Sequence, residues 1–251
     1  MSVVAILQAR VSSSRLPRKV LRQILGKPML QLQIERVQRS RMIDKLVIAT
    51  SIESSDDLLV ELCVKLGVEC YRGSLEDVLD RFYGAASAEK PDHVVRLTGD
   101  CPLTDPYVID KVVEHHLAHG AAYTSNVCPP TYPDGLDVEV MTFASLEMAW
   151  RIATLKSDRE HVTSYIRKPE ANLRLGNVEN DVDLSHLRWT VDELADFEFV
   201  TEVYTRLYRD NPHFDTQGIL DSIERQPDLL AINQGYVRNE GYKQSLLKDE
   251  H

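Results

Sequence analysis

A short segment near the N-terminus concentrates positive charge. Arg10, Arg15, Arg18 and Lys19 lie within ten residues, together with three consecutive serines, and they follow an apolar run directly. The whole chain has a formal net charge of −10, so its general composition does not explain this cluster. Guanidinium forks and a lysine ammonium suit the oxygens of a triphosphate. A surface-exposed basic loop without a ligand would have the same composition.

The spacing of this segment does not match two common phosphate-binding loops. The Walker pattern requires G-x-x-x-x-G-K-[ST], and the dinucleotide-binding pattern requires G-x-G-x-x-G. No glycine precedes Gly26. We therefore expect a different kind of phosphate site.

Two aspartates could complete such a site. Asp100 and Asp192 each follow an apolar, strand-like run. Mg²⁺ is commonly held by one or two carboxylates together with the phosphate oxygens of a substrate. Each residue also has a structural interpretation, because Asp100 could be a turn or N-cap residue ahead of Pro102, and Asp192 could cap a helix that begins near Asp196. The spacing alone leaves these interpretations open.

The elements that must position these residues alternate along the first half of the chain. Apolar runs at 3–7, 45–50, 68–71 and 93–98 predict strands, and helix-period residues follow each of them. This alternation predicts an α/β fold, a doubly wound, mostly parallel sheet with helices on both faces. Ligands of such sheets lie beyond the carboxyl ends of the strands. The basic segment and Asp100 should therefore share one rim.

The second half has a looser pattern. We expect strands at 123–126 and 138–142 around a proline-rich loop, one further strand at 187–191, and helices at 143–153, 157–167, 196–208 and 216–226. No linker rich in Gly, Ser or Pro divides the chain. We therefore predict one domain over 1–232, with a lid or interface insertion at about 124–142, and a loosely held tail over 233–251.

Composition narrows the class of protein. The chain has 251 residues, 43% of them hydrophobic and 27% charged, which is ordinary for a globular domain. No stretch approaches the roughly 20 apolar residues of a membrane span, so we expect a cytoplasmic protein with no membrane partner. The acidic balance argues against nucleic acid. The four cysteines lack a C-x-x-C pair, which predicts free thiols.

Several motifs together resemble a known family. The first is Gln8-Ala-Arg10-x-x-Ser13-Ser14-Arg15-Leu16-Pro17-x-Lys19, followed by Gly26-Lys27-Pro28-Met29 and Gly99-Asp100-x-Pro102. Later matches are Tyr71-Arg-Gly-Ser74-x-x-Asp77-Val-Leu-x-Arg81, Tyr132-Pro-Asp-Gly135-Leu-Asp137-Val-Glu139, Asp158-Arg-Glu-His161-Val and Trp189-Thr-Val-Asp192. This ordered set resembles the cytidylyltransferases that activate acidic sugars as CMP conjugates. The most similar branch is the SpsF-like spore coat polysaccharide proteins, which are similar to the CMP-acylneuraminate and CMP-Kdo synthetases.

The resemblance implies a role for each matching residue. Catalysis and triphosphate binding would fall to Arg10, Arg15, Lys19 and Asp100, with Ala9, Ser13 and Ser14 beside them. The nucleotide base would lie among Arg72, Ser74, Asp77, Arg81 and Thr98. Mg²⁺ would be held by Asp100 and Asp192. The sugar would meet Tyr132, Gly135, Asp137, Glu139, Glu160 and His161.

The implied reaction is the attack of a sugar hydroxyl on the α-phosphorus of CTP, with release of pyrophosphate. His161 titrates near neutral pH and could act as a base, or it could simply pack within its helix. The family also implies a homodimer formed through the proline-rich loop. The family often has Pro where this chain has Gln8, and the segment Thr98-Gly-Asp-Cys stands where the Kdo enzymes have a glutamine and a Glu flanking Gly-Asp. The resemblance therefore predicts neither which sugar is used nor that cytidine is the only base accepted.

Two other functions are compatible with parts of the pattern. A metal-dependent glycosyltransferase would use a nucleotide sugar, but the fourth strand does not end in Asp-x-Asp. A non-catalytic nucleotide-binding subunit of a polysaccharide pathway would not need both Asp100 and Asp192. The complete cationic segment also favours the enzyme.

Overall fold

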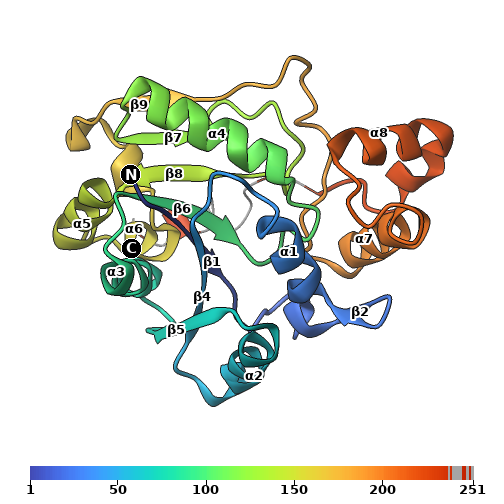
Figure 1. The fold of residues 1–251 in the computed structure, drawn as a ribbon, viewed down its shortest axis with the longest axis horizontal. Helices are drawn as coiled ribbons and strands as arrows, with labels where there is room; N and C mark the ends of the chain where they lie inside the picture. Colours follow the sequence, from blue (N-terminus) through green and yellow to red (C-terminus); the bar gives the residue numbers. More distant parts are fainter. Residues whose placement is uncertain (237, 239–244, 247–248, 250–251) are drawn as a thin grey trace.

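A mixed sheet forms the centre of the molecule. The computed structural model describes residues 1–236, 238, 245–246 and 249. Seven strands lie in the order β5-β4-β1-β6-β8-β7-β9 (Figure 1). Their bounds are β1 Val3–Gln8, β4 Lys45–Ser51, β5 Glu69–Gly73, β6 His93–Thr98, β7 Tyr123–Ser125, β8 Glu139–Thr142 and β9 Leu175–Asn177. Strands β5, β4, β1 and β6 are parallel, whereas β8 is antiparallel to both of its neighbours.

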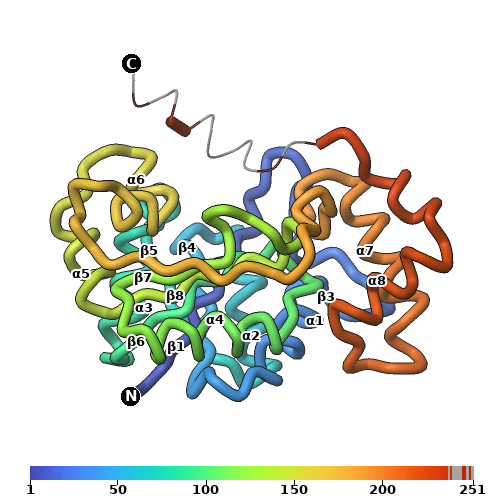
Figure 2. The backbone as a smooth tube through the Cα atoms, turned by 90° about the horizontal axis from the view of Figure 1, so that it is seen from above, coloured from blue at the N-terminus to red at the C-terminus, as the bar shows by residue number. Residues whose placement is uncertain are grey.

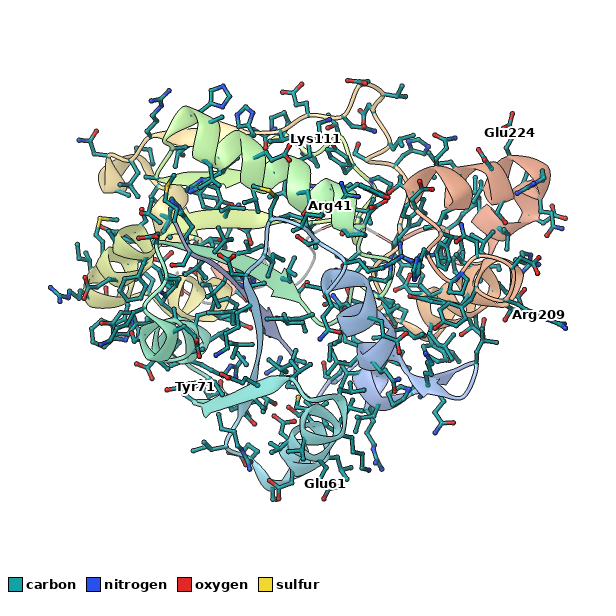
Figure 3. All side chains as sticks on the ribbon, viewed as in Figure 1. Arg41, Glu61, Tyr71, Lys111, Arg209 and Glu224 are labelled. Carbon is teal, nitrogen blue, oxygen red and sulfur yellow. The ribbon has the colours of Figure 1, made fainter. Side chains whose placement is uncertain are left out.

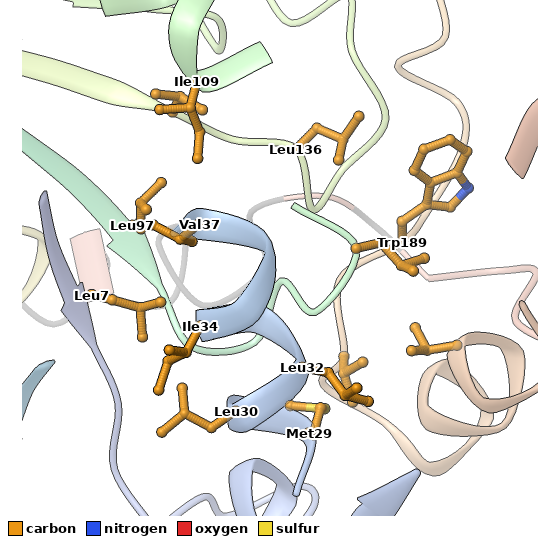
Figure 4. Close-up of a cluster of buried hydrophobic side chains, with 14 of the residues drawn as sticks. Leu7, Met29, Leu30, Leu32, Ile34, Val37, Leu97, Ile109, Leu136 and Trp189 are labelled. Carbon is orange, nitrogen blue, oxygen red and sulfur yellow. The ribbon is translucent and has the colours of Figure 1, made fainter. Parts of the chain in front are cut away.

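Helices cover both faces of this sheet. Successive residues of β1 alternate between two hydrophobic cores, because Ala5 and Leu7 pack in one and Val4 and Ile6 in the other. In Figure 4 the side chains of Leu7 and Val37 lie in the same buried cluster. The helices are α1 Met29–Val37, α2 Asp57–Leu66, α3 Val78–Glu89, α4 Pro106–His119, α5 Phe143–Ile152, α6 Lys156–His161, α7 Leu194–Leu207 and α8 Thr216–Arg225. The predicted doubly wound layers are confirmed.

The two ends of the molecule carry different helices. Figures 1 and 2 both place α5 and α6 at one end and α7 and α8 at the other. A hairpin of two short strands, β2 Gln23–Ile24 and β3 Lys27–Pro28, leads into α1. Charged side chains such as Glu61, Arg209 and Glu224 lie at the periphery (Figure 3). Within the described residues, we find no helix with the length and apolar character needed to cross a membrane.

Local sequence signals explain where the main helices begin and end. Asp77 caps α3 by accepting a hydrogen bond from the amide of Asp80, and Asp105 caps α4 by accepting one from Tyr107. Pro106 occupies the first turn of α4, and Gly120 ends that helix in the left-handed conformation. These signals are local and therefore readable from the sequence.

Helix α1 anchors the loop that carries Asp100. Gln33 is fully buried and donates from Nε2 to the carbonyl of Thr98 at 2.8 Å. Arg36, also buried, donates from Nε to the carbonyl of Thr104 at 2.6 Å. Both ends of the loop are hydrogen-bonded to the same helix, and these bonds stabilise the conformation of the loop.

Two sequence predictions fail in the second half. The helix expected over 157–167 ends at His161, because Val162 adopts φ +59°, and a 3₁₀ turn follows at Tyr165–Arg167. The prediction of a strand over 187–191 is wrong. The backbone amides of Trp189 and Thr190 donate hydrogen bonds to the carbonyl of Asp134, which lies in a loop, and not to a strand of the sheet.

The sheet instead gains β9, which the sequence did not predict. The boundaries of the domain, insertion and tail stay predictions, and most of the predicted tail lies outside the described residues.

Candidate active site

A large cleft opens at the carboxyl ends of β1 and β6. Its volume is about 1070 Å³. All of the residues predicted to bind triphosphate line it, namely Ala9, Arg10, Ser13, Ser14, Arg15 and Lys19. Both predicted metal ligands, Asp100 and Asp192, line it as well. The structure therefore brings together the basic segment and Asp100, whose shared location was expected from the sheet topology, and it adds Asp192 to them.

Lys19 lies between the two aspartates. Its Nζ donates to Asp192 Oδ1 at 2.9 Å, to the carbonyl of Val191 at 2.7 Å and to Asp100 Oδ2 at 3.4 Å. Burial lowers the pKa of Lys19, but the two carboxylates outweigh this effect and raise it overall. Burial raises the pKa of Asp100, but the charge of Lys19 and the hydrogen bonds to the carboxylate together outweigh burial, so the pKa falls. Lys19 and Asp100 are therefore both charged at neutral pH.

Arg15 contacts the same aspartate from the solvent side. Its Nη2 lies 3.0 Å from Asp192 Oδ2, and its Nη1 lies 3.5 Å from Glu193 Oε1. The Arg15 side chain is 39% exposed, so this ion pair is weak enough to open when an anion binds. Lys19 and Arg15 are thus paired with carboxylates, and either could exchange that partner for phosphate.

A buried network that the sequence analysis missed supports Asp192. Arg188 donates from Nε and Nη2 to the two carboxylate oxygens of Asp196, at 2.8 and 2.9 Å. It also contacts Asp134 at 3.3 Å and Asp192 at 3.4 Å. The bonds from Arg188 lower the pKa of Asp196 even though burial raises it. The i,i+4 spacing of Arg188 and Asp192 was the available sequence signal.

Part of the predicted base site lines the cleft. Asp77, Arg81 and Thr98 are in its wall. Burial lowers the pKa of Arg81 to about 10, with a contribution from Arg10. Arg159, which the sequence analysis did not select, also lines the cleft and donates to Asp77 from Nη2 at 2.6 Å. This pair fixes the start of α3 beside the cleft.

Two predicted base-site residues, Arg72 and Ser74, do not line the cleft. The Arg72 side chain donates to the carbonyls of Ser51 and Glu53, both at 3.0 Å, and pairs with Asp57 at 2.7 Å. Ser74 accepts from the amide of Asp77 through its hydroxyl and is not among the cleft-lining residues. Their contacts stabilise the loop between β5 and α3.

Glu139, in the predicted sugar site, holds neighbouring side chains in position. Its carboxylate accepts from Tyr123 Oη at 2.5 Å and from Thr163 Oγ1 at 2.6 Å, and it pairs with Arg96. Burial raises the pKa of Glu139, but Arg96 and Arg167 outweigh it and lower it. Arg96 and Arg167, both missed in the sequence, line the cleft. Glu139 therefore orders a guanidinium in the cleft wall.

Asp137 also lines the cleft. Arg238 Nη2 donates to Asp137 Oδ1 at 2.5 Å. Burial raises the pKa of Asp137 to about 7, with Asp134 adding to the rise and Arg238 opposing it. This carboxyl group can therefore gain or lose a proton near neutral pH.

Tyr132 and Gly135 shape the turn before Asp137. Tyr132 is buried, and its hydroxyl accepts from Lys111 Nζ at 3.0 Å. Gly135 has φ +115°, and a Cβ there would lie 2.5 Å from the amide nitrogen of Thr190. Neither residue is among those lining the cleft. They shape the turn that carries Asp137.

The remaining sugar-site residues, Glu160 and His161, line the cleft at the end of α6. Glu160 Oε2 accepts from Ser245 Oγ at 2.9 Å. Burial lowers the pKa of His161 although Glu160 opposes this effect. His161 is therefore mainly neutral at pH 7 and could accept a proton.

The comparisons with known proteins agree with this geometry. The sequence profile described as Cytidylyltransferase matches residues 4–232. The chain belongs to this family. It is 35% identical over 236 residues to the spore coat polysaccharide biosynthesis protein SpsF of Bacillus subtilis, covering 91% of this chain and 97% of SpsF. It is 38% identical to an uncharacterized protein of Methanocaldococcus jannaschii, covering 97% of this chain and 99% of that protein.

Solved structures share the fold. A cytidylyltransferase from Leptospira borgpetersenii superposes with a TM-score of 0.88 at 29% identity, covering 94% of this chain and all of that one. A CMP:2-keto-3-deoxy-manno-octonic acid synthetase complexed with CTP superposes with a TM-score of 0.63 at 17% identity, covering 82% of this chain and 99% of that one. The predicted family and the predicted enzyme class, a nucleotidyltransferase, are confirmed.

Proposed function

We propose that this cytidylyltransferase uses CTP to transfer CMP to a sugar hydroxyl, with release of pyrophosphate, in the synthesis of a polysaccharide precursor. One observation carries the proposal: Lys19 joins Asp100 and Asp192 below a basic loop, in a single cleft. The similarity to SpsF supports the polysaccharide context.

In this reaction the sugar oxygen forms a bond to the α-phosphorus of CTP, and the bond from that phosphorus to the bridging oxygen of the β-phosphate breaks. The hydroxyl proton passes to solvent or to His161. Arg10, Arg15 and Lys19 neutralise the charge that develops on the departing pyrophosphate. Ser13 and Ser14 add hydrogen bonds to the phosphates.

Asp100 and Asp192 are the proposed ligands of Mg²⁺. Their carboxylates converge on one ammonium, and hard oxygen donors of this kind suit magnesium. Within the described residues, no group of three or more His, Cys, Asp or Glu side chains could hold a metal ion, so the proposal rests on these two carboxylates. When bound, the metal would neutralise phosphate charge. The two carboxylates would leave room for the phosphate oxygens of the substrate.

The opposite part of the cleft suits an acidic sugar. Arg96 and Arg167 line this part and share the single carboxylate of Glu139, so the three side chains carry net positive charge. A guanidinium recognises a carboxylate in a planar, bidentate manner. Asp137 and Glu160 would accept hydrogen bonds from sugar hydroxyl groups. We also propose a homodimer, which light scattering on the purified protein tests directly.

The deciding experiment is calorimetric titration with CTP, UTP, ATP and GTP in the presence of Mg²⁺, followed by a pyrophosphate-release assay over a panel of acidic sugars. We expect selective CTP binding, weakened in Arg15→Ala, and loss of pyrophosphate release in Asp100→Asn with the fold intact. Arg151→Ala is the control, because Arg151 is exposed on α5 and pairs with Glu147. Failure to bind any triphosphate, or release of a nucleoside diphosphate from a nucleotide sugar, would contradict the proposal.

A further inference from the structure

The carboxylate of Asp196 is fully buried and accepts an unusual number of hydrogen bonds. Two come from Arg188 at 2.8 and 2.9 Å, and two come from the backbone amides of Asp192 and Glu193 at 3.0 and 2.9 Å. Asn233 Nδ2 donates a further bond at 3.0 Å. A helix cap needs the amide bonds but has no need of a buried guanidinium. The additional partner indicates a second role.

Arg188 connects that buried carboxylate to the cleft. Its side chain is 10% exposed, and its planar fork is fixed by the bidentate pair with Asp196. The same guanidinium reaches Asp192 Oδ2 at 3.4 Å and Asp134 Oδ2 at 3.3 Å. Asp196 therefore holds both the backbone of Asp192, through its amide, and the cation that contacts the Asp192 side chain.

The other cations on Asp192 belong to the proposed triphosphate site. Lys19 contacts Oδ1 at 2.9 Å and Arg15 contacts Oδ2 at 3.0 Å. When phosphate oxygens bind these two cations, their hold on Asp192 weakens. Among the cations that contact Asp192 in the described part of the chain, Arg188 alone lies outside the triphosphate group. It is the contact that can persist when nucleotide is bound.

We propose that Arg188 and Asp196 are positioning residues that keep the Asp192 carboxylate in its metal-binding orientation when CTP occupies Lys19 and Arg15. The inference rests on the proposed function. It assigns no direct contact with substrate to either residue. Groups that orient a metal ligand from behind change metal affinity or activity by about 10- to 100-fold when they are altered.

The test uses the full-length protein and Mn²⁺, whose binding is read by its electron paramagnetic resonance signal in the presence of a non-hydrolysable CTP analogue. Two variants are measured. Arg188→Lys keeps the charge but loses the fork, and Asp196→Asn keeps the shape but loses the charge. We expect each variant to bind Mn²⁺ about tenfold or more weakly. Binding of the CTP analogue by itself should change less than about threefold, because neither residue is in the basic loop.

A second readout separates positioning from loss of structure. In the pyrophosphate assay, raising the metal concentration should restore kcat in both variants, which a folding defect would not allow. Glu202→Gln is the matched control, because Glu202 pairs with Arg206 on the same helix but on its surface. Wild-type Mn²⁺ affinity in both variants, or a loss of kcat that added metal does not restore, overturns the inference and leaves the proposed function standing. A wild-type protein that binds no CTP analogue overturns both.

Discussion

The ammonium of Lys19 donates a 2.9 Å hydrogen bond to the carboxylate of Asp192, across 173 residues of sequence. A strong contact of this kind joins the first loop of the sheet to the segment that precedes α7. Because Lys19 also reaches Asp100, a monovalent cation already occupies the space between the two proposed metal ligands. Metal binding should therefore depend on phosphate, which draws the lysine away.

Replacement of Lys19 tests this competition. In Lys19→Ala the two carboxylates lose their shared cation, so the nucleotide-free protein should bind Mn²⁺ more tightly than the wild type. The same variant should bind CTP about tenfold or more weakly, since a charged hydrogen bond contributes roughly 1.5–3 kcal/mol. Titrations of each ligand alone measure both effects. Lys27→Ala is the control, because Lys27 pairs with Glu35 away from the cleft. Unchanged Mn²⁺ affinity in Lys19→Ala would refute the competition.

Gly135 is the glycine whose replacement should be most damaging to the turn that carries Asp137. Its φ is +115°, and an added Cβ would lie 2.5 Å from the Thr190 amide nitrogen and 2.6 Å from the Trp189 carbonyl carbon. Gly135→Ala should lower the free energy of unfolding by about 3 kcal/mol or more, because strain and a backbone clash combine.

Gly120→Ala provides the comparison for urea denaturation. Gly120 has φ +57°, but an added Cβ there would meet nothing within 4 Å. The Gly120→Ala substitution should lower the free energy of unfolding by only about 1 kcal/mol. Equal losses in the two variants would show that the backbone conformation, rather than the close approach, decides the cost.

The first half of the fold could be predicted because its signals are local. Apolar runs such as 3–7 are buried on both faces, and Asp105 and Gly120 mark the two ends of one helix. The break at Val162 could not be predicted in this way. It occurs where Thr163 donates to Glu139, a residue 24 positions away, so a tertiary contact overrides the helical pattern.

The candidate site, like the fold, has parts that could be predicted from local sequence and parts that depend on contacts in the folded protein. The basic segment could be found from its composition alone. The direction in which a side chain leaves a strand or loop depends on its partners in the folded protein, which the composition does not reveal. Arg72 was predicted to lie near the base, and its side chain contacts Ser51 and Asp57 instead of lining the cleft. Arg188 was overlooked because its partners, Asp134 and Asp196, converge on it only in the folded chain.

The buried His116 should make stability depend on pH. His116 is fully buried between His93 and Thr124, each at 3.0 Å, and burial together with the neighbouring His93 and His115 lowers its pKa to about 4 from an ordinary 6.5. The unfolded chain therefore binds more protons between these two values. The free energy of unfolding should fall as the pH drops through this window, by up to about 3 kcal/mol.

Denaturation curves at pH 7 and pH 5 measure this dependence. His116→Gln keeps a polar side chain but does not titrate, so its stability should change less over the window than that of the wild type. His213→Asn, which alters an exposed histidine, should follow the wild type. The same slope in His116→Gln would assign the effect to other groups.

Ionisation of Asp137 should make the kcat/KM of the reaction for the sugar depend on pH. Burial raises the pKa of Asp137 from 3.8 to about 7, with Arg238 opposing and Asp134, Glu139 and Asp100 adding to the rise. Below this pH the carboxyl group is protonated, and above it the carboxylate can accept hydrogen bonds from a sugar hydroxyl. Because kcat/KM reports the ionisation of the free enzyme, kcat/KM for the sugar should rise as the pH increases through about 7.

The variant Asp137→Asn separates this group from others that titrate nearby. Asparagine imitates the protonated form, so the variant should have low kcat/KM for the sugar at all pH values and no rise near pH 7. Its KM for CTP should stay within about threefold of the wild-type value, because a mutation that removes one set of contacts leaves independent binding unchanged. Asp183→Asn, in an exposed turn, serves as the control and should retain the rise. A rise near pH 7 that persists in Asp137→Asn would transfer the titration to another residue of the cleft, with His161 the first to examine.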